Sequence, residues 1–140
     1  MGIAALITWL LTAGGGAVLL GTWIAKGGAR QPTASHLPPP VVFGHFLLAA
    51  AGLVVWIIYL VVDSTALAWI AFALLVPVAA LGFAMLLRWL PVYRSRTAAA
   101  AEVIDSAPPE RHFPVPIVAA HGVLAVTTVV LVLLTALGVG

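Results

Sequence analysis

A chain of 140 residues with six Lys or Arg and four Asp or Glu carries too little charge to cover a water-facing surface. Hydrophobic residues make up 64% and charged residues 7%, whereas soluble domains have about 45–50% and about 25%. This composition excludes a soluble globular domain and a disordered chain, and the absence of Cys excludes disulfides and thiolate metal sites.

The net charge is only +2 and the basic residues form no stripe, so no nucleic-acid partner is expected. Four apolar runs cover residues 2–25, 40–62, 66–90 and 116–138. Each is long enough to cross a bilayer, which takes about 20 residues per helix. Because lipid cannot satisfy backbone polar groups, the runs predict an all-α bundle of four transmembrane helices in a single membrane domain, residues 1–140.

The basic residues predict the orientation of this bundle in the plasma membrane. All six lie in or beside the loops 26–39 and 91–115, namely Lys26, Arg30, Arg88, Arg94, Arg96 and Arg111. The positive-inside rule places both loops in the cytoplasm and both termini outside the cytoplasm. Trp23, Trp89 and Tyr93 near the same side are typical of interface anchors. The Ala-rich part of the second loop, around Glu102, is interpreted as a solvated connector or a short surface helix.

Two stretches of the chain share the pattern H-x-P-x-P-x-V-x-x-H-x-x-L-A. They are residues 36–49 and 112–125, identical at seven of fourteen positions with an offset of 76. A weaker similarity at an offset of 66 pairs Gly16 with Gly82 and Trp23 with Trp89. We therefore expect two tandem helical-hairpin repeats that face the same way, related by an axis along the membrane normal.

His45 and His121 are the histidines inside predicted spans. Pro40 and Pro116 are suited to the first turn of a helix, and each His follows its Pro by five residues, about 7–8 Å along the axis. The two imidazoles should therefore lie at matching depth. Ionisable residues inside a span are costly and indicate function. Three partners are open: a haem, a bare metal ion, or hydrogen-bonding groups of the protein.

Haem is the favoured interpretation, because two imidazoles on neighbouring helices can be the axial ligands of one haem b iron. Small residues one and two turns beyond each His would leave room for the porphyrin: Ala49 and Gly52, and Ala125. Cations at the same side would meet the propionates, and the candidates are Arg88, Arg111, His36 and His112.

Two alternatives remain beside haem. Four His could bind zinc, copper or iron, but His36 and His112 would then have to fold back toward the inner pair. Otherwise the His residues only form hydrogen bonds, and the protein is a non-catalytic structural or assembly subunit.

In the two repeated stretches, residues 36–49 and 112–125, the chain resembles small four-helix integral membrane proteins of high-GC actinobacteria, known mainly as uncharacterised proteins. In architecture it is also similar to di-histidine membrane b-type cytochromes, a likeness carried by His45 and His121. That resemblance implies electron transfer as a haem-binding subunit of a larger membrane redox complex. It implies as partners another membrane protein or further copies of the chain, and a quinone as a candidate substrate.

Overall fold

The computed structural model describes residues 1–98 and 107–139. Four α-helices run through this part of the chain: α1 (Gly2–Ala25), α2 (Pro39–Val62), α3 (Thr65–Ala98) and α4 (Val115–Ala136). All four are long and apolar enough to cross a membrane. The prediction of an all-α, four-span membrane protein is confirmed.

Prolines begin helices α2 and α4, and a residue in the left-handed conformation ends α2. Pro39 and Pro40 open α2, and Pro116 lies in the first turn of α4, where the missing N–H has no intrahelical partner to lose. Asp63 ends α2 in the left-handed conformation, with φ 54°, and α3 begins two residues later. Helices α2 and α3 therefore form the tight hairpin that the short polar turn predicts.

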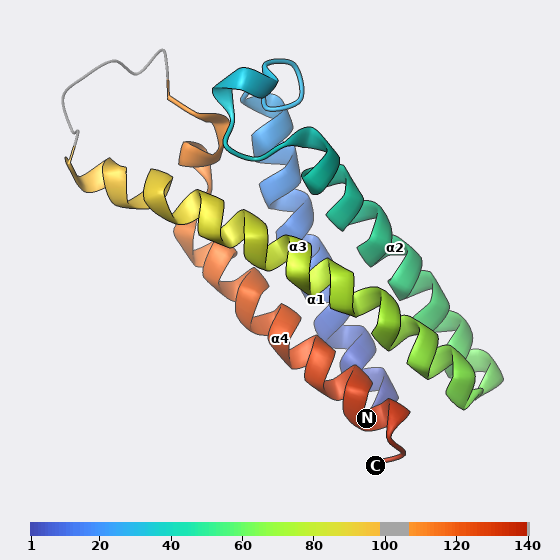
Figure 1. The fold of residues 1–140 in the computed structure, drawn as a ribbon. Coiled ribbons are helices and arrows are strands. Elements are labelled where there is room, and N and C mark those ends of the chain that lie inside the picture. Colours follow the sequence, from blue (N-terminus) through green and yellow to red (C-terminus); the bar gives the residue numbers. More distant parts are fainter. Residues whose placement is uncertain (99–106, 140) are drawn as a thin grey trace.

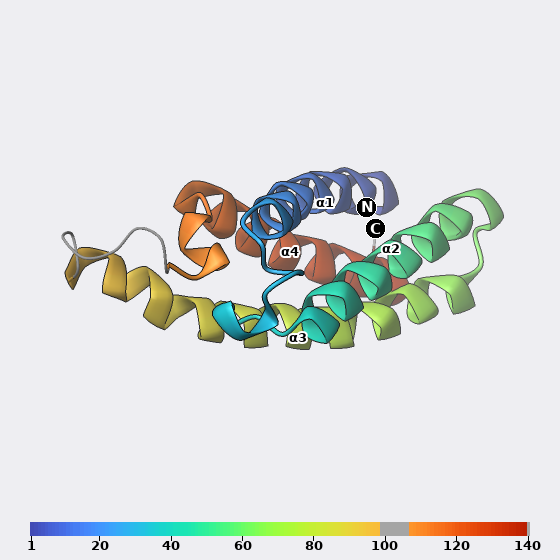
Figure 2. The ribbon, with the colours of Figure 1, turned by 90° about the horizontal axis from the view of Figure 1, so that it is seen from above.

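The four helices run alternately up and down, so both termini lie at one end of the bundle (Figure 1). Helix α1 packs mainly on α4, and α2 packs mainly on α3. Fewer residues are in contact between α1 and α2 and between α3 and α4. Helices α2 and α4 thus occupy opposite corners of the bundle, as the view from above shows (Figure 2). The short 3-10 helices η1 (Pro32–Ala34) and η3 (Pro109–His112) lie at the end opposite the termini. We call this the basic end, because Lys26, Arg30, Arg88, Arg94 and Arg111 belong to it.

Helix α3 is longer than its predicted span. It continues through Pro91 to Ala98, whereas a loop was expected from residue 91. Pro91 removes one hydrogen bond, but Trp89 and Val92 on either side of it are buried, and α3 packs on η3. This packing holds the last turns in place. The interpretation of the Ala-rich stretch around Glu102 concerns residues outside the described part of the chain.

The buried residues form two clusters, one toward each end of the bundle. The cluster near the termini is built on Trp9 and Trp56, with Leu75 and Val132. The cluster at the basic end contains Trp23, Leu37, Val42, Trp89 and Phe113. The histidines inside the spans lie between these two clusters.

Candidate functional site

His45 of α2 and His121 of α4 meet in the middle of the bundle. Their ring centres are 6.2 Å apart, and the ring planes are inclined by 59°. The two histidines come from helices at opposite corners and from opposite halves of the sequence. The structure thus brings together the pair on which the haem interpretation depends.

Each imidazole is oriented by a backbone carbonyl of the helix on which it packs. The Nδ1 of His45 lies 2.9 Å from the carbonyl oxygen of Val78, and the Nδ1 of His121 lies 2.8 Å from that of Thr12. A carbonyl only accepts, so both Nδ1 atoms carry the hydrogen and donate it. In the neutral rings this leaves each Nε2 with a lone pair. Neither Nε2 has a hydrogen-bond partner among the described residues.

A glycine lies against each ring, one helical turn beyond the carbonyl that orients it. A Cβ on Gly16 would come within 3.1 Å of Cε1 of His121, and a Cβ on Gly82 would come within 3.1 Å of Cε1 of His45. A larger residue would push the ring away from its carbonyl. Gly16 and Gly82 are equivalent at the offset of 66, and Thr12 and Val78 are separated by the same 66 positions.

The rings lie in a middle layer of the bundle, between the two buried clusters. Val78, whose carbonyl orients His45, is buried, whereas residues 79–88 of α3 and 43–51 of α2 are half-buried or exposed. His45 and His121 are themselves half-buried. Ala49 and Ala125 follow the two histidines by one helical turn, whereas Gly52 is buried against the ring of Trp9.

The ring centres are 6.2 Å apart, within the range of about 4.5–7 Å for a contact between two rings. A metal atom between two Nε2 atoms, with metal–nitrogen bonds of about 2.0–2.1 Å, would need a similar separation. Metal-binding imidazoles usually donate their second ring N–H to a carbonyl or carboxylate, as both rings do here.

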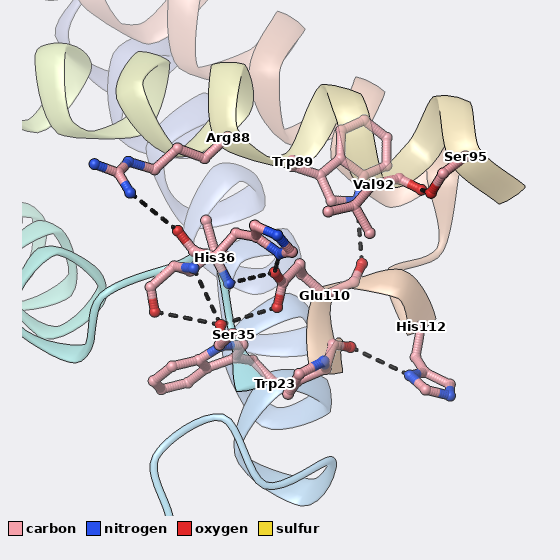
Figure 3. Close-up of polar contacts among 11 residues, drawn as sticks. Trp23, Ser35, His36, Arg88, Trp89, Val92, Ser95, Glu110 and His112 are labelled. Carbon is pink, nitrogen blue, oxygen red and sulfur yellow. Dashed lines mark hydrogen bonds and ion pairs between the residues drawn. The ribbon is translucent and has the colours of Figure 1, made fainter. Parts of the chain in front are cut away.

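A second polar cluster lies at the basic end, around the carboxylate of Glu110 (Figure 3). Glu110 is fully buried. Its Oε1 accepts from the backbone N–H of His36 at 2.7 Å and from Nδ1 of His36 at 2.9 Å, and its Oε2 accepts from the hydroxyl of Ser35 at 2.9 Å. The Glu110 backbone carbonyl accepts from Nε1 of Trp89 at 3.1 Å. The carboxylate thus ties the loop before α2 to the loop before α4.

The predicted interface anchors Trp23 and Trp89 belong to this cluster. Both are buried, and Nε1 of Trp23 donates to the hydroxyl oxygen of Ser35 at 2.9 Å. The expectation that they face the membrane interface is wrong, because their indole N–H groups are used inside the bundle end. Tyr93 is exposed and stacks on Trp89, with ring centres 5.1 Å apart.

The residues that were predicted to meet the haem propionates also lie at the basic end. Arg88 donates to the backbone carbonyl of His36 at 3.3 Å. His36 and Arg111 line a surface pocket, and His112 is exposed with its Nδ1 3.3 Å from the carbonyl of Pro109. Among the described residues, no group of three or more His, Asp or Glu side chains could hold a metal ion. The structure therefore gives no support to a site made of all four histidines.

Sequence reasoning missed several residues of both clusters. Glu110 was not among the predicted site residues, although it is the one carboxylate in a stretch of prolines and basic residues. Gly16 and Gly82 could have been found from the sequence, since they are matched in the weaker similarity at an offset of 66. The carbonyls of Thr12 and Val78 could not, because every residue has a carbonyl.

No protein-family model, curated protein or solved structure matches the chain. The fold and the two clusters define a small four-span membrane protein.

Proposed function

We propose that this membrane protein binds one haem b between His45 and His121 and serves in electron transfer as a subunit of a larger membrane redox complex. The pairing of the two imidazoles supports this proposal most strongly. Their ring centres are 6.2 Å apart, and neither Nε2 has a hydrogen-bond partner among the described residues. Two imidazoles on different helices can both ligate one haem iron.

The haem would supply reversible one-electron transfer, and the chain supplies its ligands and surroundings. His45 and His121 would present Nε2 atoms that no described residue occupies. The carbonyls of Val78 and Thr12 fix the tautomer and the orientation of the rings. Ala49 and Ala125 keep the adjacent helix faces small.

The basic end supplies positive charge on one side of the proposed haem. Arg88 lies six residues beyond Gly82 on α3, about 9 Å along the helix axis, so it is the basic residue on α3 nearest to the level of the pair. We assign the propionate contact to Arg88, because Arg111, His36 and His112 lie farther out, at the surface of the basic end.

We further propose that the two hairpins are tandem repeats. Equivalent positions play matching roles in the two halves: Gly16 and Gly82 pack on the rings, and Trp23 and Trp89 are both buried with their Nε1 bonded. The pairing of α1 with α4 corresponds to that of α3 with α2 under the same exchange of halves. Such a two-fold relation would give the two axial ligands equivalent surroundings.

The haem content of purified protein from haem-replete cells tests the assignment. We expect about one haem per chain in the wild type, and a large loss in His45→Ala and in His121→Ala, because an axial ligand is removed. His36→Ala and His112→Ala are matched controls that remove an imidazole outside the pair and should retain haem. A wild-type protein without haem, or equal content in all four variants, would contradict the proposal.

A structural role for the pair is the second candidate, and the hydrogen bonds to Thr12 and Val78 favour it. They join α4 to α1 and α2 to α3, and interhelical bonds of this kind contribute about 0.6 kcal/mol each in membrane proteins. In that case His45→Ala would lower stability in a protein that never contains haem.

A further inference from the structure

A surface pocket at the basic end lies apart from the histidine pair. It measures about 270 Å³ and is lined by His36, Pro91, Val92, Ser95, Pro108 and Arg111. Ser95 is thirteen residues beyond Gly82 on α3, about 20 Å along the helix axis. The pocket is therefore separate from the middle layer.

A guanidinium borders this pocket. Arg111 is half-buried, and its guanidinium has no hydrogen-bond partner among the described residues. The ring of His36 forms part of the wall, held through Nδ1 by Glu110. A guanidinium is suited to phosphate oxygens, to which it can donate two hydrogen bonds at once.

The charges around the pocket favour an anion. Arg88 binds the carbonyl of His36, and Arg94 lies on the same stretch of α3. Glu110 is the one acid among the described residues of this end, and it is not part of the lining. Its two carboxylate oxygens accept from Ser35 and His36, so its negative charge is compensated within the bundle.

The position along α3 favours a lipid over a free ion. Leu87 and Phe83 lie one and two turns from Pro91 toward the middle of the membrane, and they are 55% and 62% exposed. Pro91 is in the lining, so an apolar stripe leads from the bilayer to the pocket. Basic pockets at the ends of transmembrane helices bind lipid headgroups in this way.

We propose that this pocket binds the phosphate group of an anionic phospholipid, with Arg111 as the donor, His36 in the wall and an acyl chain along Leu87 and Phe83. The proposal does not depend on haem. It assigns a function to the extension of α3 past Pro91, which forms one wall of the pocket.

Binding is tested with the full chain in detergent, titrated with phosphatidylglycerol and followed by native mass spectrometry. We expect one tightly retained phosphatidylglycerol, and at least a tenfold loss of affinity in Arg111→Gln. Arg30→Gln removes the same charge from the other loop of this end and should bind as wild type. Size-exclusion elution of both variants checks that they are folded, and haem content is recorded separately.

Two further measurements identify the ligand. Phosphatidylcholine should bind at least tenfold more weakly, because its headgroup has no net charge, and millimolar inorganic phosphate should not displace phosphatidylglycerol, because it lacks the acyl chains. Equal binding by Arg111→Gln and wild type, equal binding of the two lipids, or displacement by inorganic phosphate would each overturn the proposal.

Discussion

At the scale of single residues, the middle of the bundle is built from two small units of the same design. Each unit contains an imidazole, a carbonyl that accepts its Nδ1–H and a glycine one turn farther along the same helix. The carbonyl sets the direction of the ring, and the glycine lets the ring approach the helix. The histidines could be found from the sequence because ionisable residues are rare inside spans. Their carbonyl partners could not, because they depend on how the helices pack.

Substitution of these glycines tests the design. In Gly16→Ala the new Cβ would lie 3.1 Å from Cε1 of His121, and in Gly82→Ala it would lie 3.1 Å from Cε1 of His45. We expect each change to shift its ring and to destabilise the protein by about 1–3 kcal/mol through overpacking. Haem affinity should fall in parallel.

Gly14→Ala is the matched control, because a Cβ there meets nothing within 4 Å. It should be neutral or stabilising by about 0.5–1 kcal/mol, since Ala is the better helix former. Thermal unfolding in detergent and a haem titration measure both effects. Equal behaviour of Gly14→Ala, Gly16→Ala and Gly82→Ala would contradict the role of the glycines.

At the scale of elements, the bundle is closed at one end by a carboxylate that joins two loops. Glu110 in η3 binds Ser35 and His36 from the loop before α2, and Trp89 of α3 binds the backbone of Glu110. Three separate segments of the chain therefore meet at a single buried side chain. A buried carboxylate is stable only when its oxygens are satisfied, and here both are.

Removal of this carboxylate should loosen the basic end. Glu110→Ala leaves the backbone N–H of His36 without its acceptor and leaves the hydroxyl of Ser35 only the carbonyl of Leu37. A buried donor without an acceptor costs about 1–3 kcal/mol. Glu110→Gln keeps the shape and one acceptor oxygen, so its loss of stability should be smaller. Unfolding in detergent, followed by the fluorescence of the buried Trp23 and Trp89, measures the difference. Wild-type stability of Glu110→Ala would show that the link contributes nothing.

The elements differ in how far the sequence predicts them. The spans followed from hydropathy, since lipid leaves an apolar run of this length few structures other than a helix. The extension of α3 to Ala98 did not, because Pro91 and the polar residues after it are typical of a helix end. Packing of Trp89 and Val92 at the basic end outweighs that local preference. The partners of Glu110 were likewise invisible, because they lie 74 and 75 positions away in the chain.

At the scale of the whole molecule, the polar groups are distributed unevenly along the bundle. The end with the termini has an apolar core built on two tryptophans. The middle layer holds the histidine pair, and the opposite end holds the basic residues, Glu110 and the pocket. All the polar chemistry described here thus lies in the middle layer or at the basic end.

The orientation of the bundle follows from this unevenness. Because both termini lie at the end opposite the basic residues (Figure 1), the positive-inside rule predicts that both are outside the cytoplasm. Alkaline phosphatase, which is active only outside, should be active when fused after Gly140, and green fluorescent protein at the same site should be dark. A fluorescent fusion without phosphatase activity would reverse the predicted orientation.

If two imidazoles from opposite corners of the bundle share one haem iron, the reduced-minus-oxidised absorption spectrum of the purified protein should show it. We expect a sharp α-band at about 560 nm, as for iron with two imidazole ligands. That band should be lost or broadened in both His45→Ala and His121→Ala and kept in His36→Ala. A colourless wild-type protein from haem-replete cells, or an unchanged band in His45→Ala, would mean that the pair does not hold haem.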